Sequence, residues 1–390
     1  MRKENLKKIT ELRHELHREP ELSMQEERTM ARLVTFLQDN TDLEIVRRTG
    51  WLYAVKAGRP GGRRIAFRAD MDALPIQETL PLPYASCRAG ISHKCGHDGH
   101  CAALCGLALE LSRAETADTI YLIFQPGEET GEGAKRCCGL IRQEGIEEIY
   151  AFHNLPGYPE GKLVYREGLT QPASEGLRIR LEGKTSHASA PEASRNPAQA
   201  LSRITLYSQT LSRQPSEAMR LCTVTGLNVG SGDFGISPGL GELSLTLRAE
   251  REEEMNGMEA ALLSCAAKEA EEGGFVLTHE IRDRFPETRN HAACLARVIR
   301  AAEKLGIPAA PMESLWRASE DFGQYLKECP GAMFYLGAGE KNPALHTDTY
   351  DFNDGLLETA VDLFTALATN RRWCFQKRQS DLSRNILMIL

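Results

Sequence analysis

The sequence has no run of about 20 apolar residues, so it contains no segment that could cross a bilayer as a helix. It has no excess of basic residues either: 47 Lys and Arg stand against 54 Asp and Glu, and the net charge of −7 argues against binding to a nucleic-acid backbone. The first residues, MRKENLKKIT, are charged and lack the apolar stretch of a secretory signal. Together these absences predict a soluble, cytoplasmic protein that binds neither nucleic acid nor membrane.

The eleven cysteines lack a framework spacing, and their odd number favours reduced thiols. A thiol-redox protein is one alternative, built on Cys137 and Cys138 or on Cys101 and Cys105. Adjacent cysteines such as Cys137 and Cys138 rarely form a disulfide with each other, because the backbone geometry is unfavourable. Cys101 and Cys105 lie one helical turn apart in an apolar pattern, which favours buried, inert thiols.

The length of 390 residues predicts about two domains, and 42% hydrophobic with 26% charged residues is typical of a globular protein. In the first part of the chain, helical patterns alternate with short β-rich runs, which predicts an α/β layer with a mostly parallel sheet. The helical patterns cover residues 4–18, 26–37, 100–113 and 133–144, and the β-rich runs cover residues 52–57, 64–68, 119–124 and 148–152.

The pattern changes after about residue 172. Leu177, Ile179 and Leu181 alternate with charged residues, and the stretch 243–247 repeats this alternation, as in an antiparallel sheet with one solvated face. Helical segments at 196–212 and 253–271 would cover its other face. After residue 285 the first style returns, with helices at 292–305 and 356–368 around an apolar run at 332–337. We therefore predict a discontinuous catalytic domain, 1–172 and 286–370, interrupted by a smaller α+β lid domain, 173–285, and followed by a tail, 371–390, of unassigned structure.

Two short motifs point to metal chemistry. Cys95 and His97 stand two apart in a glycine-broken segment, where a thiolate and an imidazole can turn toward one ion. An isolated motif of this kind is more often a polar loop. Glu128 and Glu129 directly follow the predicted strand 119–124, where open α/β sheets place their ligands. Two adjacent carboxylates there would repel each other unless a cation lay between them, although an acidic turn is equally compatible with this pair alone.

Two further histidines follow predicted strands. His153 ends the run 148–152, and His346 follows the run 332–337 after a glycine-rich loop. Four strand ends in one predicted layer would thus deliver a cysteine, three histidines and a glutamate. Five ligands are too many for one tetrahedral ion and suit two ions that share a ligand. Spacing alone leaves open whether these side chains converge.

Eight stretches of the chain, in order, resemble the M20 metallopeptidase family, specifically its amidohydrolase branch of hippurate hydrolases, N-acyl-amino-acid amidohydrolases and indole-acetyl-amino-acid hydrolases. Together they cover nearly everything from about residue 5 to 369, and the combination is far more specific than any one of them. The stretches are LRHELHREPELSMQEERT (12–29), FRADMDALPIQE (67–78), KCGHDGHCAAL (94–104), FQPGEETGEGA (124–134), AFHNLP (151–156), GKTSHASAP (183–191), SEDFG (319–323) and LHTDTYDFND (345–354).

The resemblance implies roles for nine residues. The general base would be Glu128, and Asp70 would be a supporting carboxylate. His187, in the lid, would stabilise the oxyanion and, as in relatives, reach into the site of a partner subunit, which implies a homodimer formed through the lid. Arg248 would bind the free carboxylate of the substrate. The metal ligands would be Cys95, His97, Glu129, His153 and His346, with Cys95 as a thiolate bridge.

By the same resemblance, the chain is expected to hydrolyse the amide bond of small N-acyl amino acids or related amides. Two divalent ions per subunit, Zn²⁺ or Mn²⁺ in the first place and otherwise Ni²⁺ or Co²⁺, would supply a metal-bound hydroxide, and Glu128 would handle its proton. A dipeptidase or carboxypeptidase of the same wider family is an alternative, although the Cys95-x-His97 pattern favours the amidohydrolase branch. A non-catalytic metal-binding protein is a further alternative, against which the intact Glu128-Glu129 pair argues.

Two positions depart from the family's pattern. Gly235 stands where relatives commonly carry an asparagine, in a stretch that reads A-N-V-I-P in them, and Glu192 replaces a second histidine after Pro191. Loss of an amide donor and gain of a carboxylate near the pocket would shift the substrate preference, for example toward an extra amine or a bulkier group. A comparison of kcat/KM between wild type and Gly235→Asn across acyl amino acids tests this hypothesis.

Overall fold

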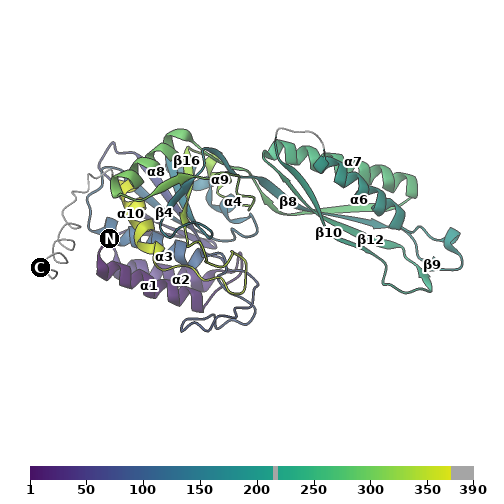
Figure 1. Cartoon of the computed structure of the whole chain (residues 1–390), viewed down its shortest axis with the longest axis horizontal. Helices are drawn as coiled ribbons and strands as arrows, with labels where there is room; N and C mark the ends of the chain where they lie inside the picture. The colour runs from purple at the N-terminus through teal and green to yellow at the C-terminus, as the bar shows by residue number, and fades with distance from the viewer. Residues whose placement is uncertain (214–217, 370–390) are drawn as a thin grey trace, which may run out of the picture.

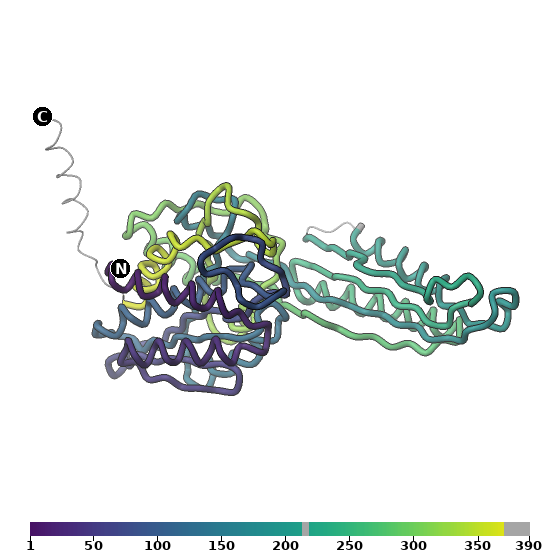
Figure 2. The backbone as a smooth tube through the Cα atoms, turned by 90° about the horizontal axis from the view of Figure 1, so that it is seen from below, coloured from purple at the N-terminus to yellow at the C-terminus, as the bar shows by residue number. Residues whose placement is uncertain are grey.

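The computed structural model describes residues 1–213 and 218–369; the tail predicted for 371–390 lies outside these residues. The chain forms a broad lobe, which contains the N-terminus, and an elongated lobe that projects from one side of it (Figure 1). Seen from below, the projecting lobe is narrow and long (Figure 2). Within the described residues, no helix is both long enough and apolar enough to cross a membrane.

The broad lobe is built on an eight-stranded sheet with the strand order β1-β2-β4-β3-β5-β16-β6-β15. Its centre, β4-β3-β5-β16, is parallel, and antiparallel pairs occur toward the edges, so the predicted mostly parallel sheet is confirmed. The strands are β1 (Glu44–Arg48), β2 (Trp51–Lys56), β3 (Arg64–Asp70), β4 (Thr119–Gln125), β5 (Glu148–Leu155), β6 (Leu163–Tyr165), β15 (Ala309–Pro311) and β16 (Gly331–Gly337).

Helices cover both faces of this sheet. One face is packed by α1 (Lys3–Arg18), α2 (Glu27–Asn40), α3 (His97–Ser112), α8 (Ala292–Leu305) and α10 (Leu356–Thr369). The other face is packed by α4 (Gly133–Cys137), α5 (Gly139–Glu144) and α9 (Gly323–Leu326). The single helix predicted for 133–144 is therefore wrong, because the chain divides at Cys138 into two short helices.

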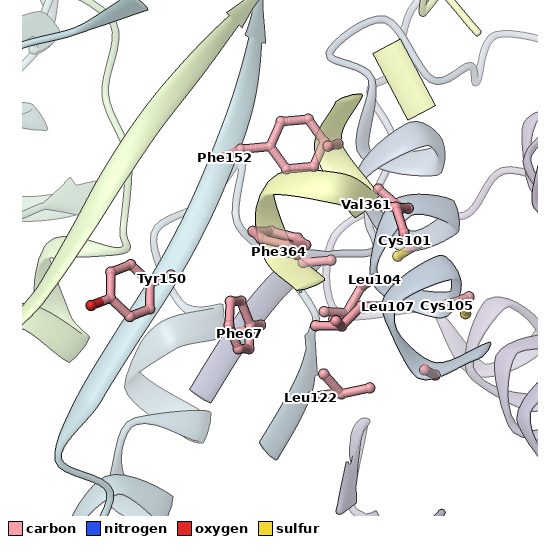
Figure 3. Packing of buried hydrophobic residues seen from close by; sticks show 14 of the residues in the cluster. Phe67, Cys101, Leu104, Cys105, Leu107, Leu122, Tyr150, Phe152, Val361 and Phe364 are labelled. Carbon is pink, nitrogen blue, oxygen red and sulfur yellow. The ribbon is translucent and has the colours of Figure 1, made fainter. Parts of the chain in front are cut away.

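The central helix α3 connects the hydrophobic core to the polar edge of the sheet. Nearly all of its residues are buried, because α1, α10 and the sheet surround it. In Figure 3, Phe364 of α10 packs against Phe67 and Phe152, with ring centroids 5.0 and 5.5 Å away. The ring of His100, in the first turn of α3, lies 4.9 Å from that of Phe152. The packing that buries α3 therefore also fixes the start of this helix.

The projecting lobe is a four-stranded antiparallel sheet with the order β10-β12-β8-β13, covered on one face by two helices. The predicted alternation is confirmed, because Leu177, Ile179 and Leu181 are buried under the helices while Arg178 and Arg180 are not. Its elements are β8 (Ala173–Glu182), α6 (Ala198–Arg213), β10 (Arg220–Val229), β12 (Leu240–Ala249), α7 (Glu252–Gly273) and β13 (Val276–Phe285). We refer to this lobe as the lid.

Short elements complete the chain. A ribbon of two strands accompanies the passage between the lobes, and a second ribbon with a short 3-10 helix lies at the far end of the lid (Figure 1). They are β7 (Gly168–Gln171) with β14 (Thr288–Asn290), and β9 (Ser186–His187) with β11 (Ile236–Ser237) beside η1 (Pro191–Ala193). The predicted domain limits at residues 172/173 and 285/286 stay a prediction, although β8 begins at Ala173 and β13 ends at Phe285.

Candidate metal centre

The start of α3 places Cys95 and His97 side by side. His97 is the first residue of the helix, and Gly96 before it has a left-handed backbone with φ 97°. A Cβ at this position would lie 2.5 Å from Asn154 Oδ1 and 2.9 Å from the Tyr350 hydroxyl, so only glycine fits. The tight turn at Gly96 directs the thiol and the imidazole toward the same space.

The five predicted ligands converge at the carboxyl ends of the central strands. Cys95 Sγ lies 3.4 Å from His153 Nε2, His97 Nε2 lies 3.8 Å from Glu129 Oε1, and His346 Nε2 lies 3.3 Å from the same oxygen. Two groups of three donors, each with all atoms within 4.8 Å, share the thiol of Cys95. The groups are Cys95, His97, His153 and Cys95, Glu129, His346.

The imidazoles present their free nitrogens to this cluster. His97 Nδ1 contacts the Asp72 carbonyl oxygen at 2.9 Å and Asp72 Oδ1 at 3.2 Å, and His153 Nδ1 contacts the Asn154 carbonyl oxygen at 2.7 Å. A proton on Nδ1 donates to these acceptors and leaves the Nε2 lone pair facing the cluster. His97 Nε2 and Glu129 Oε1 are buried and have no hydrogen-bond partner among the described residues. These two orphaned atoms, with the thiol of Cys95 beside them, form a set of nitrogen, oxygen and sulfur donors that fits divalent ions such as Zn²⁺.

Burial and crowded charges perturb the acids of the cluster. Burial, followed by repulsion from Glu320 and Glu129, raises the pKa of Glu128 well above its usual range. Burial, with Glu129 and Glu128 nearby, also raises the pKa of the Cys95 thiol well above its ordinary value. A cation bound among these groups would favour their charged forms and oppose both shifts.

Asp70 lies behind the cluster and is tied into a buried ionic network. Its carboxylate contacts Arg68 Nη1 at 2.7 Å and His100 Nδ1 at 2.6 Å, and His97 Nε2 lies 3.7 Å away. Despite burial, the charges of His97 and Arg68 hold the pKa of Asp70 well below its usual range. Without a cation, burial lowers the pKa of His97, but Asp70 and Asp72 outweigh it and raise this pKa to about 10. A metal ion bound at Nε2 would displace the proton from this nitrogen.

Sequence reasoning assigned no role to three residues that hold the site together. Asp72 receives the hydrogen bond of His97 Nδ1, and Arg68 bridges Asp70 to Glu320 with contacts of 2.7 and 3.0 Å. All three lie in the stretches 67–78 and 319–323 that the resemblance singled out. Asp72 also lies two residues after Asp70, a spacing that was a usable signal for a second carboxylate on the same side.

A cavity of about 560 Å³ opens over the cluster, between the two lobes. Arg248, on β12, lines it and donates from Nη1 to the Arg317 carbonyl oxygen and to Ser319 Oγ, both at 2.8 Å. Arg248 is thus near the predicted ligands within one chain. Its remaining guanidinium N–H groups offer donors to an anion in the cavity.

His187 lies elsewhere. It belongs to β9 at the far end of the lid, is exposed, and contacts Ser189 Oγ through Nδ1 at 2.7 Å (Figure 1). Gly235 and Glu192 lie in the same region, since the Gly235 carbonyl oxygen accepts a hydrogen bond from Ala188 N and Glu192 is part of η1. Within one chain, the fold therefore separates His187 from the other predicted site residues.

Comparison with known proteins identifies the family. The model of peptidase family M20/M25/M40 matches residues 66–370. N-acetylcysteine deacetylase of Bacillus subtilis is 30% identical over 368 residues, covering 93% of this chain and 96% of the relative. Hippurate hydrolase of Campylobacter jejuni is 29% identical over 372 residues, covering 92% of this chain and 94% of the relative.

A solved structure extends the likeness to the whole fold. The YXEP protein of Bacillus subtilis, a dinuclear metal-binding peptidase of the M20 family, superposes with a TM-score of 0.79 at 28% identity, covering 94% of this chain and 98% of the other. The match to the family model, the curated relatives and the shared two-lobed architecture agree. The chain therefore belongs to peptidase family M20/M25/M40 and is a hydrolase of carbon–nitrogen bonds.

Proposed function

We propose that this protein is a dinuclear metal amidohydrolase that cleaves the amide bond of N-acyl amino acids. The observation that carries the proposal is the pair of three-donor groups around the shared thiol of Cys95, with orphaned atoms on His97 and Glu129. The deacetylase and hippurate hydrolase relatives support the substrate class. The residues that would hold the two ions are Cys95, His97, Glu129, His153 and His346.

Bound there, Zn²⁺, Mn²⁺ or a similar divalent cation supplies Lewis-acid activation of water and of the substrate carbonyl. The Glu128 carboxylate takes a proton from the attacking water and gives it to the leaving nitrogen. Its position supports this role, because Glu128 lines the cavity beside Glu129 and lies outside both ligand groups centred on Cys95. A bound cation would favour the charged form of Glu128, which is the form that can accept this proton.

Arg248 would orient the substrate through its free carboxylate. Among the described residues it is the one arginine that lines the cavity, and burial lowers its pKa without removing its charge at neutral pH. A carboxylate in this cavity would find few other cationic partners, because the remaining polar lining groups are acids, imidazoles, a thiol and Ser319. We therefore assign Arg248 to substrate binding.

His187 would act across a homodimer formed through the lid. The edge strand β10 supports such an interface, because residues 221–229 carry no charged side chain and Leu227 is 47% exposed. The opposite edge, β13, carries His279, Glu280, Arg282 and Asp283, charges that typically protect an edge from pairing. Leu206 of α6, which packs beside β10, is 64% exposed. The uncharged edge thus favours a second copy of this chain as its partner.

The decisive experiment is a hydrolysis screen on protein loaded separately with Zn²⁺, Mn²⁺, Ni²⁺ and Co²⁺. N-acetyl and N-benzoyl amino acids should be hydrolysed, and unblocked dipeptides should be poor substrates. Preference for dipeptides would instead favour the dipeptidase alternative, and inactivity with all of them would favour a non-catalytic metal-binding protein.

Subunit complementation tests the role of His187. The Glu128→Gln and His187→Ala proteins are each expected to be inactive alone. Hybrid dimers that contain one subunit of each variant should regain activity. One mixed site then combines an intact Glu128 with a His187 from the other chain. Failure to regain activity in a mixture shown to contain hybrid dimers would refute action across the dimer.

A further inference from the structure

Several apolar residues line the cavity above the metal centre. Leu155 and Pro156 follow His153 at the end of β5, Phe285 ends β13 of the lid, and Trp316 lies in the loop before α9. Leu155 and Phe285 are themselves buried, with exposed fractions of 6% each. Ligand sites commonly combine such an apolar wall with a few polar groups that fix orientation.

The indole of Trp316 is held in a defined place on this wall. Its ring lies 5.3 Å from the ring of His153 at 70° and 5.3 Å from that of Tyr335 at 89°. His153 and Tyr335 are register partners on β5 and β16, so the indole rests across two neighbouring strands. Such edge-to-face contacts restrain an aromatic ring.

The loop that carries Trp316 is also fixed from the lid. Arg248 donates to the carbonyl oxygen of Arg317, the next residue, and to Ser319 Oγ, while Ser319 Oγ lies 2.6 Å from Ser174 Oγ of β8. Trp316 is thus linked to a predicted metal ligand on one side and to the proposed carboxylate-binding arginine on the other. A partly exposed indole in this position borders the space where an acyl amino acid would bind.

We propose that Trp316 forms the wall of an apolar subsite that accepts a substrate substituent bulkier than methyl, and that it thereby selects against N-acetyl derivatives of small amino acids. This inference rests on the proposed function and specifies its substrate class. The shared chemistry is a planar or branched apolar group, carried either by the acyl part or by the amino-acid side chain. Apolar contact with one such group changes kcat/KM by about 10- to 200-fold per methylene-sized difference in favourable sites.

A kinetic test varies the substrate along both arms. One arm compares N-acetylglycine with N-benzoylglycine, and the other compares N-acetylalanine with N-acetylphenylalanine. For the wild type, at least one bulky member should exceed its small counterpart at least ~10-fold in kcat/KM. Trp316→Ala should remove most of that advantage while small substrates lose little, and Trp316→Phe, which keeps an aromatic ring, should retain it.

Binding measured without turnover separates this inference from the proposed function. The chain has only three tryptophans, so titration of the metal-loaded protein with benzoate, acetate, phenylalanine or alanine can be followed by indole fluorescence. A bulky product should quench emission and bind at least ~10-fold more tightly than its small counterpart, and the quenching should vanish in Trp316→Phe. If no acyl amino acid is hydrolysed but this pattern holds, the subsite stands and the proposed reaction fails.

Three outcomes would overturn the proposal. The first is equal affinity and equal kcat/KM for bulky and small members in both arms. The second is an equal loss for all substrates in Trp316→Ala. The third is a loss of metal per subunit in Trp316→Ala with unchanged selectivity, which would reduce Trp316 to a support of His153.

Discussion

At the residue scale, the site depends on which nitrogen of each imidazole is already engaged. Asp72 and the Asn154 carbonyl occupy Nδ1 of His97 and His153, so both rings offer Nε2 to the cluster. Such partners fix the tautomer of a metal ligand and increase its basicity. Asp72 therefore matters as much to the geometry of the site as the ligand that it orients.

Glu128→Gln should reduce kcat at least ~10²-fold with unchanged metal content, because positioned general bases contribute that much and Gln preserves the shape of the side chain. Steady-state kinetics and elemental analysis of the loaded protein measure both quantities. Glu132→Gln is the matched control, since Glu132 is an exposed glutamate four residues further along the chain, and its carboxylate pairs with Lys135 at 2.6 Å. Near-normal activity of Glu128→Gln would remove Glu128 from its proposed role.

Cys95→Ser should lower the occupancy of both ions, because Cys95 belongs to both three-donor groups and a hydroxyl is a weaker ligand than a thiolate. Metal per subunit after dialysis against a weak chelator is the readout. Cys87→Ser, which alters an exposed thiol, should keep the wild-type content. Two retained ions in Cys95→Ser would contradict the shared ligand.

At the scale of elements, the two strands that connect the lid to the broad lobe carry a buried glutamate paired with an arginine, with further acids of α7 nearby. Glu175 of β8 is buried beside Arg284 of β13, and that guanidinium also contacts Glu259 and Asn256 of α7, with Glu252 3.9 Å away. Burial, only partly offset by Arg284, raises the pKa of Glu175 to about 7. One of the connecting strands therefore carries a carboxyl group that binds its proton more tightly than an ordinary glutamate does.

The sign of the resulting pH effect follows from linkage. A carboxyl whose pKa rises from 4.5 to about 7 on folding binds its proton more tightly in the folded state, so its contribution to stability is complete below about pH 4.5 and is lost as the pH rises toward 7. Glu175→Gln keeps the neutral form at every pH. It should be more stable than wild type above pH 7 by on the order of 1–3 kcal/mol, with little difference at low pH.

Urea unfolding of the metal-loaded protein between pH 5 and 8 measures this difference. Glu182→Gln, at the exposed distal end of the same strand, should parallel the wild type. If the difference in unfolding free energy between Glu175→Gln and wild type stayed constant from pH 5 to 8, the pKa of Glu175 would not be raised to about 7 in the folded state.

At the scale of the whole molecule, the elongated lid leaves an uncharged edge and exposed leucines that a second copy would cover. Leu206→Asp combined with Leu227→Asp should shift the protein from dimer to monomer in light scattering, since buried charges oppose association. Activity should fall with dimer content, because His187 would no longer reach a neighbouring site. Val276→Asp, on the charged edge strand β13, is the control and should remain dimeric. A double variant that stays dimeric would place the interface elsewhere.

The main layers of the fold could be predicted from the sequence, because helical spacing and strand alternation depend on residues close together in the chain. Alternation at Leu177, Ile179 and Leu181 predicted the antiparallel lid, and an apolar run before Glu128 predicted a central strand with acids at its end. The break at Cys138 escaped prediction, since residues 133–144 keep a helical composition across it. No strand is predicted from the sequence at β10, β6 or β15 either, and the last two have only three residues each.

Which side chains of the site meet could not be read from the sequence and depends on the folded structure. Cys95, His153 and His346 are separated by dozens to hundreds of residues, and their distances depend on the register of β3, β4, β5 and β16 and on the left-handed turn at Gly96. Partners of a buried imidazole, such as Asp72, and the indole beside His153 are set by packing in three dimensions. Sequence spacing predicts the elements and their buried faces, whereas contacts between distant segments arise from the packing of the whole chain. His187 and Arg248 illustrate this: both belong to the lid, but Arg248 lines the cavity and His187 lies at the far end of the lid (Figure 1).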